Sequence, residues 1–224
     1  ALVAGTPPAA GSTSSRPGAL AREAKPKAAA EAQVDVRLLS KHRPTRLRLD
    51  GPRSLEVVAT GDTLIVEGRP QPNALRLDAG RWHVRGRGVD RRYEAALSLE
   101  ARDGELILVA TFALETYVAA VTASETEVGT PFEALRAQAI TARSYVLASG
   151  KRHDEARACD LTHCQVLRGE GFARHLRRAR DAARSTEGVV LRLSDGAIAS
   201  LPSTQAAADT RRARGRVRCS GPHR

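Results

Sequence analysis

Residues 105–121 read ELILVATFALETYVAAV, and within this run the apolar pattern changes from a period of two residues to a helical period. Before the change, residues 105–109 have the composition of a β-strand. From Phe112 onward, apolar residues recur at helical spacing. The run therefore predicts a strand that leads into a helix, and a protein whose sheet and helices occupy different parts of the chain.

From Val34 to Ala110, the chain consists of short segments in which apolar and polar residues alternate, with Gly and Asp turns between them. Alternation with such turns is typical of antiparallel sheet. Asp103-Gly104 is a two-residue hairpin signal directly before Glu105. Strands are expected at residues 34–38, 47–49, 55–58, 63–66, 82–84, 93–99 and 105–109.

A second helix is predicted from Pro131 to Ser149. Thr130 is expected to be its N-cap, with Glu133 completing a Thr-x-x-Glu capping box, and Gly150 is expected to end it in the left-handed region. One side of this helix should be buried because it carries apolar residues at i, i+4, i+7 and i+11. This stripe comprises Leu135, Ala139, Ala142 and Val146.

A last strand pair is expected at residues 188–193 and 197–199. The predicted fold class is therefore α+β: an antiparallel β-rich part at residues 34–111, packed with a helical part and the short strand pair within residues 112–204. Residues 1–33 are dominated by Ala, Pro, Gly, Ser and Lys, and we expect them to be disordered or linker-like.

The net charge of +11 suggests an anionic partner. Residues 210–224 contain six Arg and no acidic residue, so more than half of the excess lies in this tail. Aromatic residues make up only 3% of the chain, too few for the stacking platforms of single-strand binders. We therefore expect no specific nucleic acid partner. Of the three functional hypotheses for this chain, a basic nucleic-acid binder is the weakest. Attraction to an acidic wall polymer fits the charge as well.

The chain contains no run of 18 apolar residues, so no transmembrane segment is predicted. It also contains no Met, and Ala1-Leu2-Val3-Ala4-Gly5 is similar to the end of a cleaved signal peptide. From these features we expect an exported protein, in the periplasm or at the cell surface of a bacterium.

Two separated motifs carry a family resemblance. The first runs from Leu114 through Ser124-Glu125 to Tyr145 and includes EALRAQAITARSY at residues 133–145; the second is CDLTHCQVLRG at residues 159–169. On these motifs the chain resembles the SpoIID/LytB family of peptidoglycan lytic transglycosylases, some of whose members are called amidase enhancers. The resemblance implies action on peptidoglycan glycan strands, in cell-wall remodelling or in the sporulation of spore formers, together with a cell-wall amidase as a partner.

The resemblance maps the catalytic acid onto Glu125, in the connector before the second helix. A lytic transglycosylase protonates the glycosidic oxygen and then uses the same carboxyl group as the base on the 6-hydroxyl of the sugar. Packing against apolar neighbours would raise the pKa of such a carboxyl group. The alternative interpretation is an ordinary surface carboxylate with Glu127 as its neighbour.

Substrate contacts are implied for four further residues. Arg136 and Arg143 map onto basic positions of the motif and would line the cleft, where they would bind sugar oxygens or a lactyl carboxylate. Seven residues apart on a helix, they lie about 20° from each other. For both, a solvated helix face is the alternative. Gln138 and Tyr145 would add polar contacts, although core packing suits the ring of Tyr145 better.

His153, Cys159, His163 and Cys164 form a candidate structural zinc site with four protein ligands. The competing interpretation is a Cys159–Cys164 disulfide, which is natural in an oxidising compartment. A third interpretation is that these residues form neither a zinc site nor a disulfide. Cys219 is left without a partner.

Two segments depart from the family pattern. Around Glu125, the sequence Ala123-Ser124-Glu125-Thr126-Glu127 lacks two prolines and a Met of the usual motif. At residues 205–224, an Arg-rich sequence replaces a Gly-rich one, and we hypothesise that this tail is aberrant and read out of frame. Both departures favour the alternative function, a non-catalytic wall-binding amidase enhancer.

Overall fold

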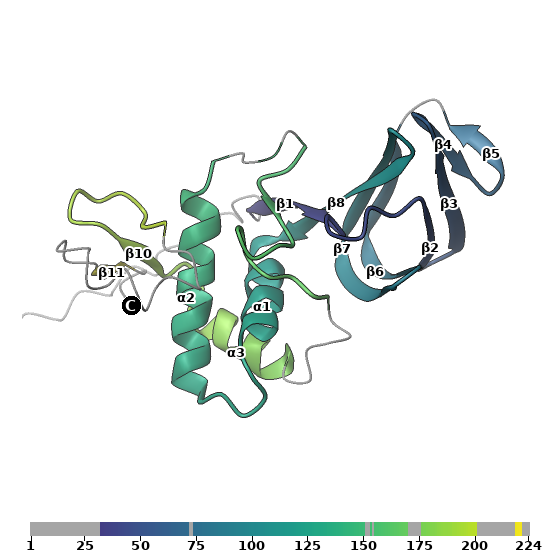
Figure 1. Ribbon diagram of the computed structural model, residues 1–224. Coiled ribbons are helices and arrows are strands. Elements are labelled where there is room, and N and C mark those ends of the chain that lie inside the picture. Colours follow the sequence, from purple (N-terminus) through teal and green to yellow (C-terminus); the bar gives the residue numbers. More distant parts are fainter. Residues whose placement is uncertain are drawn as a thin grey trace, which may run out of the picture. The chain divides into compact units, whose positions relative to one another are not determined.

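The computed structural model describes residues 32–71, 74–150, 153, 155–169, 176–200 and, for the backbone alone, 218–220. These residues form an α+β fold with a nine-stranded sheet and three helices (Figure 1). Within the described ranges, no helix has both the length and the apolarity needed to cross a membrane. Of the linker predicted at residues 1–33, residues 1–31 fall outside the described residues, and Gln33 already belongs to a strand. The predicted aberrant tail at residues 205–224 also falls outside them, apart from the strand at 218–220.

All seven predicted strand segments are strands, and most are longer than expected. Neighbouring strands pair antiparallel, except that the short β9 runs parallel to β1. The strand order is β5-β4-β3-β2-β6-β7-β8-β1-β9. The strands are β1 (Gln33–Leu38), β2 (Arg46–Asp50), β3 (Ser54–Thr60), β4 (Thr63–Val66), β5 (Arg69–Gln71), β6 (Leu75–Gly86), β7 (Val89–Arg102), β8 (Glu105–Ala113) and β9 (Ala158–Cys159).

The hairpin between β7 and β8 follows its sequence signal. Asp103 and Gly104 have φ angles of 51° and 77°, and Arg102 pairs with Glu105. Two consecutive positive φ angles are typical of the type I′ turn, whose twist matches that of the two strands. The predicted hairpin is therefore confirmed.

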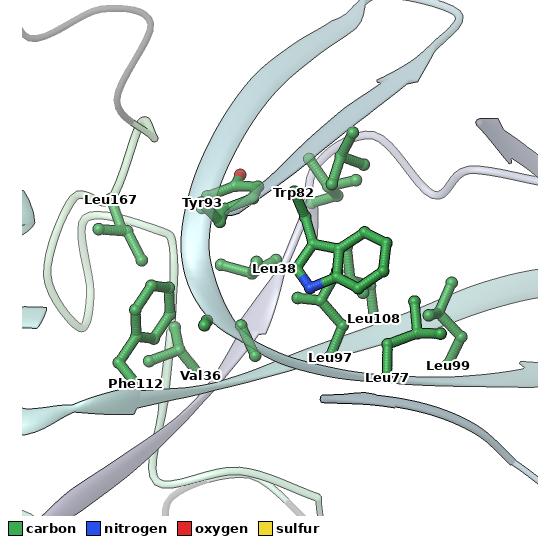
Figure 2. Packing of buried hydrophobic residues seen from close by; sticks show 14 of the residues in the cluster. Val36, Leu38, Leu77, Trp82, Tyr93, Leu97, Leu99, Leu108, Phe112 and Leu167 are labelled. Atoms are coloured by element: carbon green, nitrogen blue, oxygen red, sulfur yellow. The ribbon is translucent and has the colours of Figure 1, made fainter. Parts of the chain in front are cut away.

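The core lies on the inner face of the sheet (Figure 2). The same cluster includes Tyr117, Val118 and Val121 of the helical part. Trp82 is 4% exposed and packs over Gly51, where an added Cβ would lie 2.5 Å from the indole ring. The ring centroid of Phe112 on β8 lies 6.4 Å from the ring centroid of Tyr93 on β7 and 6.1 Å from that of Tyr117. Because Tyr117 belongs to the first helix, these aromatic contacts join the sheet to the helical part.

The helices are α1 (Leu114–Glu125), α2 (Phe132–Ala148) and α3 (Leu176–Ser185). The helix α1 begins two residues later than Phe112, where the change in apolar period predicted its start, because β8 continues to Ala113. The four residues of the predicted stripe on α2 are all fully buried. The third helix was not predicted, since its buried side consists of Ala179, Ala182 and Ala183 and most of its other residues are arginines.

The predicted caps of α2 are wrong. Pro131 is the N-cap, and the hydroxyl of Thr130 donates to the carbonyl of Glu127 at 2.8 Å, which closes a turn in the loop instead of capping the helix. At the other end Ser149 is the C-cap, and its hydroxyl donates to the carbonyl of Tyr145 at 2.7 Å. Gly150 is not among the residues with positive φ, so the left-handed end is also wrong.

The predicted last strand pair is only partly right. β10 (Val190–Arg192) pairs with β11 (Arg218–Ser220), a segment far along the chain. The expected partner at residues 197–199 forms an isolated bridge between Ile198 and Arg192.

Candidate active site and cysteine–histidine cluster

Glu125 is the last residue of α1, and not part of the connector as predicted. Its side chain is half-buried. The amide of Gln138, on α2, donates to Oε2 at 2.7 Å, and the backbone N–H of Val166 donates to Oε1 at 2.9 Å. Both carboxylate oxygens are therefore held by donors from two separate parts of the chain.

The segment that supplies the Val166 N–H runs along the end of α1. Next to it, the N–H of Arg168 donates to the hydroxyl of Ser124 at 3.1 Å. The buried hydroxyl of Tyr117 donates to the side-chain oxygen of Gln165 at 2.9 Å. Three contacts, at residues 165, 166 and 168, thus fix this segment against α1, and with it the orientation of the Glu125 carboxylate.

The backbone at Gly169 and the hydroxyl of Tyr117 are both tightly enclosed near Glu125. Gly169 ends the segment at a φ of 75°, where an added Cβ would lie 2.9 Å from the carbonyl oxygen of Arg92. Burial raises the pKa of the Tyr117 hydroxyl well above its usual value, and the nearby charge of Glu125 raises it further. The hydroxyl of Tyr117 therefore remains a hydrogen-bond donor at physiological pH.

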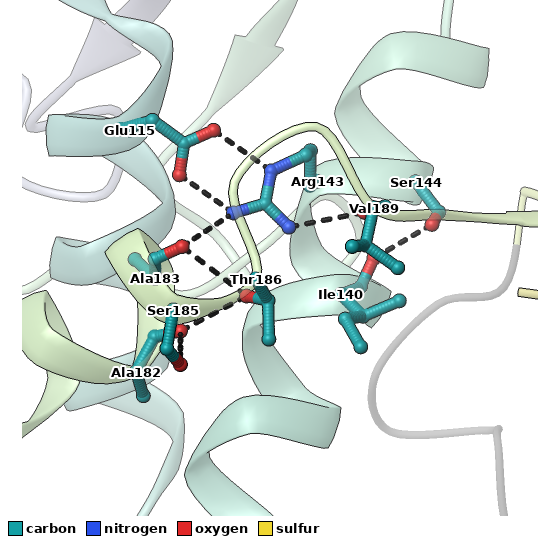
Figure 3. Close-up of polar contacts among 9 residues, drawn as sticks. All are labelled: Glu115, Ile140, Arg143, Ser144, Ala182, Ala183, Ser185, Thr186 and Val189. Carbon is teal, nitrogen blue, oxygen red and sulfur yellow. Dashed lines mark hydrogen bonds and ion pairs between the residues drawn. The ribbon is translucent and has the colours of Figure 1, made fainter. Parts of the chain in front are cut away.

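Arg143 occupies a different place from the one predicted (Figure 3). Its side chain is 0% exposed, and its guanidinium donates to both carboxylate oxygens of Glu115, at 2.8 and 2.6 Å. It also donates to the carbonyls of Val189 and Ala183, both at 3.1 Å. Because its donors are engaged between α1, α2 and α3, the expectation that Arg143 lines a substrate cleft is wrong.

The other predicted contact residues separate into different environments. Gln138 reaches Glu125, as described. Arg136 pairs with Glu133 at 2.8 Å and is 39% exposed, as the alternative of a solvated helix face predicted. Tyr145 is buried, and its hydroxyl donates to the carbonyl of His163 at 3.2 Å, in agreement with the alternative of core packing. Arg136 and Arg143 therefore do not share surroundings, although they lie on one side of the helix.

The structure brings the four candidate metal ligands together. The ligand atoms of His153, Cys159, His163 and Cys164 all lie within 4.8 Å of one another. Nε2 of His163 lies 3.2 Å from Sγ of Cys159, and Nε2 of His153 lies 3.4 Å from Sγ of Cys164. Tetrahedral zinc, with bonds of about 2.3 Å to sulfur and about 2.1 Å to nitrogen, separates S and N by roughly 3.6 Å. The donor set fits zinc, and these two S–N separations lie within about 0.4 Å of that value.

No disulfide joins the two cysteines of the cluster. Cys159 and Cys164 are both buried free thiols, and burial raises the pKa of the Cys159 thiol to about 12. The disulfide interpretation therefore does not describe this structure.

The cluster is anchored to the sheet and leads directly to the Glu125 site. β9, which contains Cys159, pairs with β1, and the carboxylate of Asp160 accepts the N–H of Leu39 at 2.7 Å. Cys164 immediately precedes residues 165–168, the segment that holds the Glu125 carboxylate. The cluster and the segment that holds the Glu125 carboxylate are therefore direct neighbours along the backbone.

A charged cavity of about 440 Å³ lies at the other end of α1. It is lined by Glu115 and Thr116 on α1, by Arg180 and Arg184 on α3, and by Glu94. Ten residues of helix, about 15 Å, separate Glu115 from Glu125. Glu125 does not line this cavity, so the two are distinct sites.

Sequence reasoning missed several residues of the site. Tyr117 and Ser124 could have been found, because both are polar and, seven residues apart, lie on one face of α1. The N–H of Val166 gives no signal in the sequence, since a backbone donor has no residue preference. Glu115 was missed because its partner, Arg143, was expected at the surface.

The comparisons with known proteins agree with the motifs. Residues 102–193 match the family model SpoIID, described as stage II sporulation protein. This range contains Glu125, Gln138 and the whole cysteine–histidine cluster. A search of curated proteins found no match to the chain.

Proposed function

Residues 102–193 belong to the SpoIID family, and from this premise we propose that the protein is a lytic transglycosylase that cleaves the glycan strands of bacterial peptidoglycan. The family name connects the chain with sporulation, and action on the cell wall is part of the proposal. The observation that carries the proposal is the fixed carboxyl group of Glu125, held through both oxygens by Gln138 and Val166.

The proposed reaction needs one carboxyl group in two roles. Glu125 first donates its proton to the glycosidic oxygen as the bond to the anomeric carbon breaks. The resulting carboxylate then removes the proton from the 6-hydroxyl of the same sugar, whose oxygen attacks the anomeric carbon. The product carries a 1,6-anhydro ring, no water is consumed, and Glu125 ends in its protonated form.

The residues around Glu125 have positioning roles in this proposal. Gln138 and the Val166 N–H fix the orientation of the carboxyl group, which must face first the leaving oxygen and then the 6-hydroxyl. A fixed acid loses less entropy on reaching the transition state than a mobile one. A glycoside hydrolase, by contrast, uses a pair of carboxyl groups, and the carboxylate next along the loop, Glu127, is exposed.

We also propose that His153, Cys159, His163 and Cys164 hold a structural zinc ion. Four protein ligands leave no open position for a substrate or for water, so zinc would supply cross-linking and no catalytic chemistry. Its effect would be to fix the loop from Cys159 to Gly169, which orients Glu125. For the protein as a whole, we propose export to the periplasm or the cell surface, where peptidoglycan is accessible.

Metal analysis tests the zinc site. We expect the purified protein to contain one zinc ion per chain, and Cys159→Ser to lose it with a fall in melting temperature of several degrees. Cys219→Ser removes the third cysteine and is the matched control, which should keep the metal. A variant Cys159→Ser with full zinc content would contradict the site, and so would a mass spectrum with Cys159 and Cys164 linked.

Product analysis tests the function. Purified protein is incubated with glycan strands stripped of stem peptides, and the products are examined by mass spectrometry. We expect new 1,6-anhydromuramoyl ends. Reducing ends formed with uptake of water would show hydrolysis instead, and the absence of any product together with stimulation of an amidase would support the non-catalytic alternative.

A further inference from the structure

A basic groove lies in the β-rich part of the chain, outside the residues that match the family. Its volume is about 780 Å³, and it is bounded by the segment before β2, by β2 itself and by the turn between β6 and β7. Five arginines and His42 line it, with Glu56 as the one acidic residue among its lining. The arginines are Arg43, Arg46, Arg48, Arg85 and Arg87.

The backbone explains why the groove forms and why its walls are basic. β2 pairs with β6 only from Arg48 to Asp50, so Arg46 extends beyond the end of the ladder. Gly86 approaches β2 closely, because an added Cβ would lie 3.0 Å from the carbonyl oxygen of Arg46. Arg46 and Arg48 alternate with buried leucines and therefore share the outer face, about 6.7 Å apart along the strand.

The arginines are arranged around anions. Arg48 and Arg85 are directly opposite each other on paired strands, a like-charge placement that destabilises a sheet unless an anion lies between the two cations. Here the anion is Asp50, which accepts from Nε of Arg48 at 3.1 Å and from Nε of Arg85 at 2.9 Å. The hydrogen bond from Ser54 is the largest cause that holds the pKa of Asp50 below its usual range, and the hydrogen bonds from Arg85 and Arg48 lower this pKa further.

The cations of the groove are available to a ligand. The side chains of Arg46 and Arg48 are 65% and 60% exposed, and exposed ion pairs such as Arg46–Glu56 contribute only about 0–1 kcal/mol each. Within the described part of the chain, the side chain of Arg87 has no acidic partner. A phosphate group can therefore replace a carboxylate at small cost, in the bidentate geometry that guanidinium groups favour.

We propose that this groove binds a phosphodiester polymer of sugars or polyols, the class of acidic polymer that accompanies peptidoglycan. The choice of a wall polymer rests on the proposed function, whereas the groove itself does not. Among the described residues, no Phe, Tyr or Trp lines the groove, so it lacks the large aromatic platforms on which single-strand binders stack bases. The protein would thus be held at the wall by a site separate from Glu125.

Binding of labelled poly(glycerol phosphate) to the full chain tests the proposal. We expect Arg46→Gln with Arg87→Gln to weaken binding about tenfold at roughly 50 mM salt, and to lower the dependence of affinity on salt by the equivalent of one to two phosphate contacts. The control is Arg177→Gln with Arg178→Gln, which removes the same charge from two exposed positions of α3 and should bind almost as the wild type does.

A gain of affinity provides a test that misfolding cannot imitate. Glu56→Gln releases Arg46, so we expect it to bind the polymer several-fold more tightly. Equal losses in the groove and control variants would overturn the proposal, and so would tighter binding of single-stranded DNA than of the polymer. The groove variant should still form anhydro ends, which separates a failure of this site from a failure of the proposed catalytic function.

Discussion

Glu125→Gln should reduce the formation of 1,6-anhydro ends by about 10²–10⁴-fold, the usual contribution of a general acid–base group. An amide has nearly the shape of a carboxyl group, but it can neither give up a proton to the glycosidic oxygen nor accept one from the 6-hydroxyl. The replacement keeps an oxygen that can accept the Val166 N–H, and Gln138 can turn its own amide to suit the new partner. We therefore expect loss of activity without loss of folding, measured as the initial rate of anhydro-end formation beside a thermal melt.

The matched control for this variant is Glu127→Gln. It removes the same charge two residues further along, from an exposed carboxylate. We expect its rate to remain within about twofold of the wild type, since surface substitutions away from a site have small effects. An active Glu125→Gln, or equal losses in both variants, would remove the acid–base role from Glu125.

The strands could be predicted because their signal is local. In β2, for example, Leu47 and Leu49 are buried while Arg46 and Arg48 are exposed, and this alternation is visible in the sequence. The short β5 and β9 were missed because three and two residues carry too little pattern. The end of β8 was placed too early, since strand and helix both accept the small residues Ala110 and Ala113.

The cysteine–histidine cluster could be predicted from residue types alone, because two Cys and two His within a short segment are a typical set of zinc ligands. The spatial relation of the cluster to Glu125 could not be predicted from the sequence. That relation depends on the N–H of Val166, and on a segment whose path is set by Tyr117 and Gln165. Long-range packing of this kind has no counterpart in the periodicity of the sequence.

Arg143 shows the limit of a helical wheel. The spacing of seven placed Arg136 and Arg143 on one side of α2, and the structure does not contradict that placement. Their environments differ because α3 packs against α1 and α2 near Arg143 and supplies the carbonyl of Ala183. Since the sequence of α3 has no large apolar stripe, its covering of Arg143 could not be foreseen.

Arg143→Met should lower the free energy of unfolding by about 3–5 kcal/mol, the usual effect of removing one partner from a buried ion pair. The substitution leaves the carboxylate of Glu115 without its guanidinium and leaves the carbonyls of Val189 and Ala183 without a donor. Urea denaturation gives the value. Arg136→Met is the matched control on the same helix, and we expect a change of at most about 1 kcal/mol because its pair with Glu133 is exposed.

Two further measurements separate a structural role of Arg143 from a role in substrate binding. If Arg143 is structural, Glu115→Leu should recover part of the stability lost in Arg143→Met, because the pair then becomes apolar on both sides. If Arg143 instead contacted the glycan, its replacement would raise KM and leave the unfolding curve unchanged. A loss of stability below about 1 kcal/mol would contradict the buried network between α1, α2 and α3, and the placement of Arg143 in a substrate cleft would then have to be reconsidered.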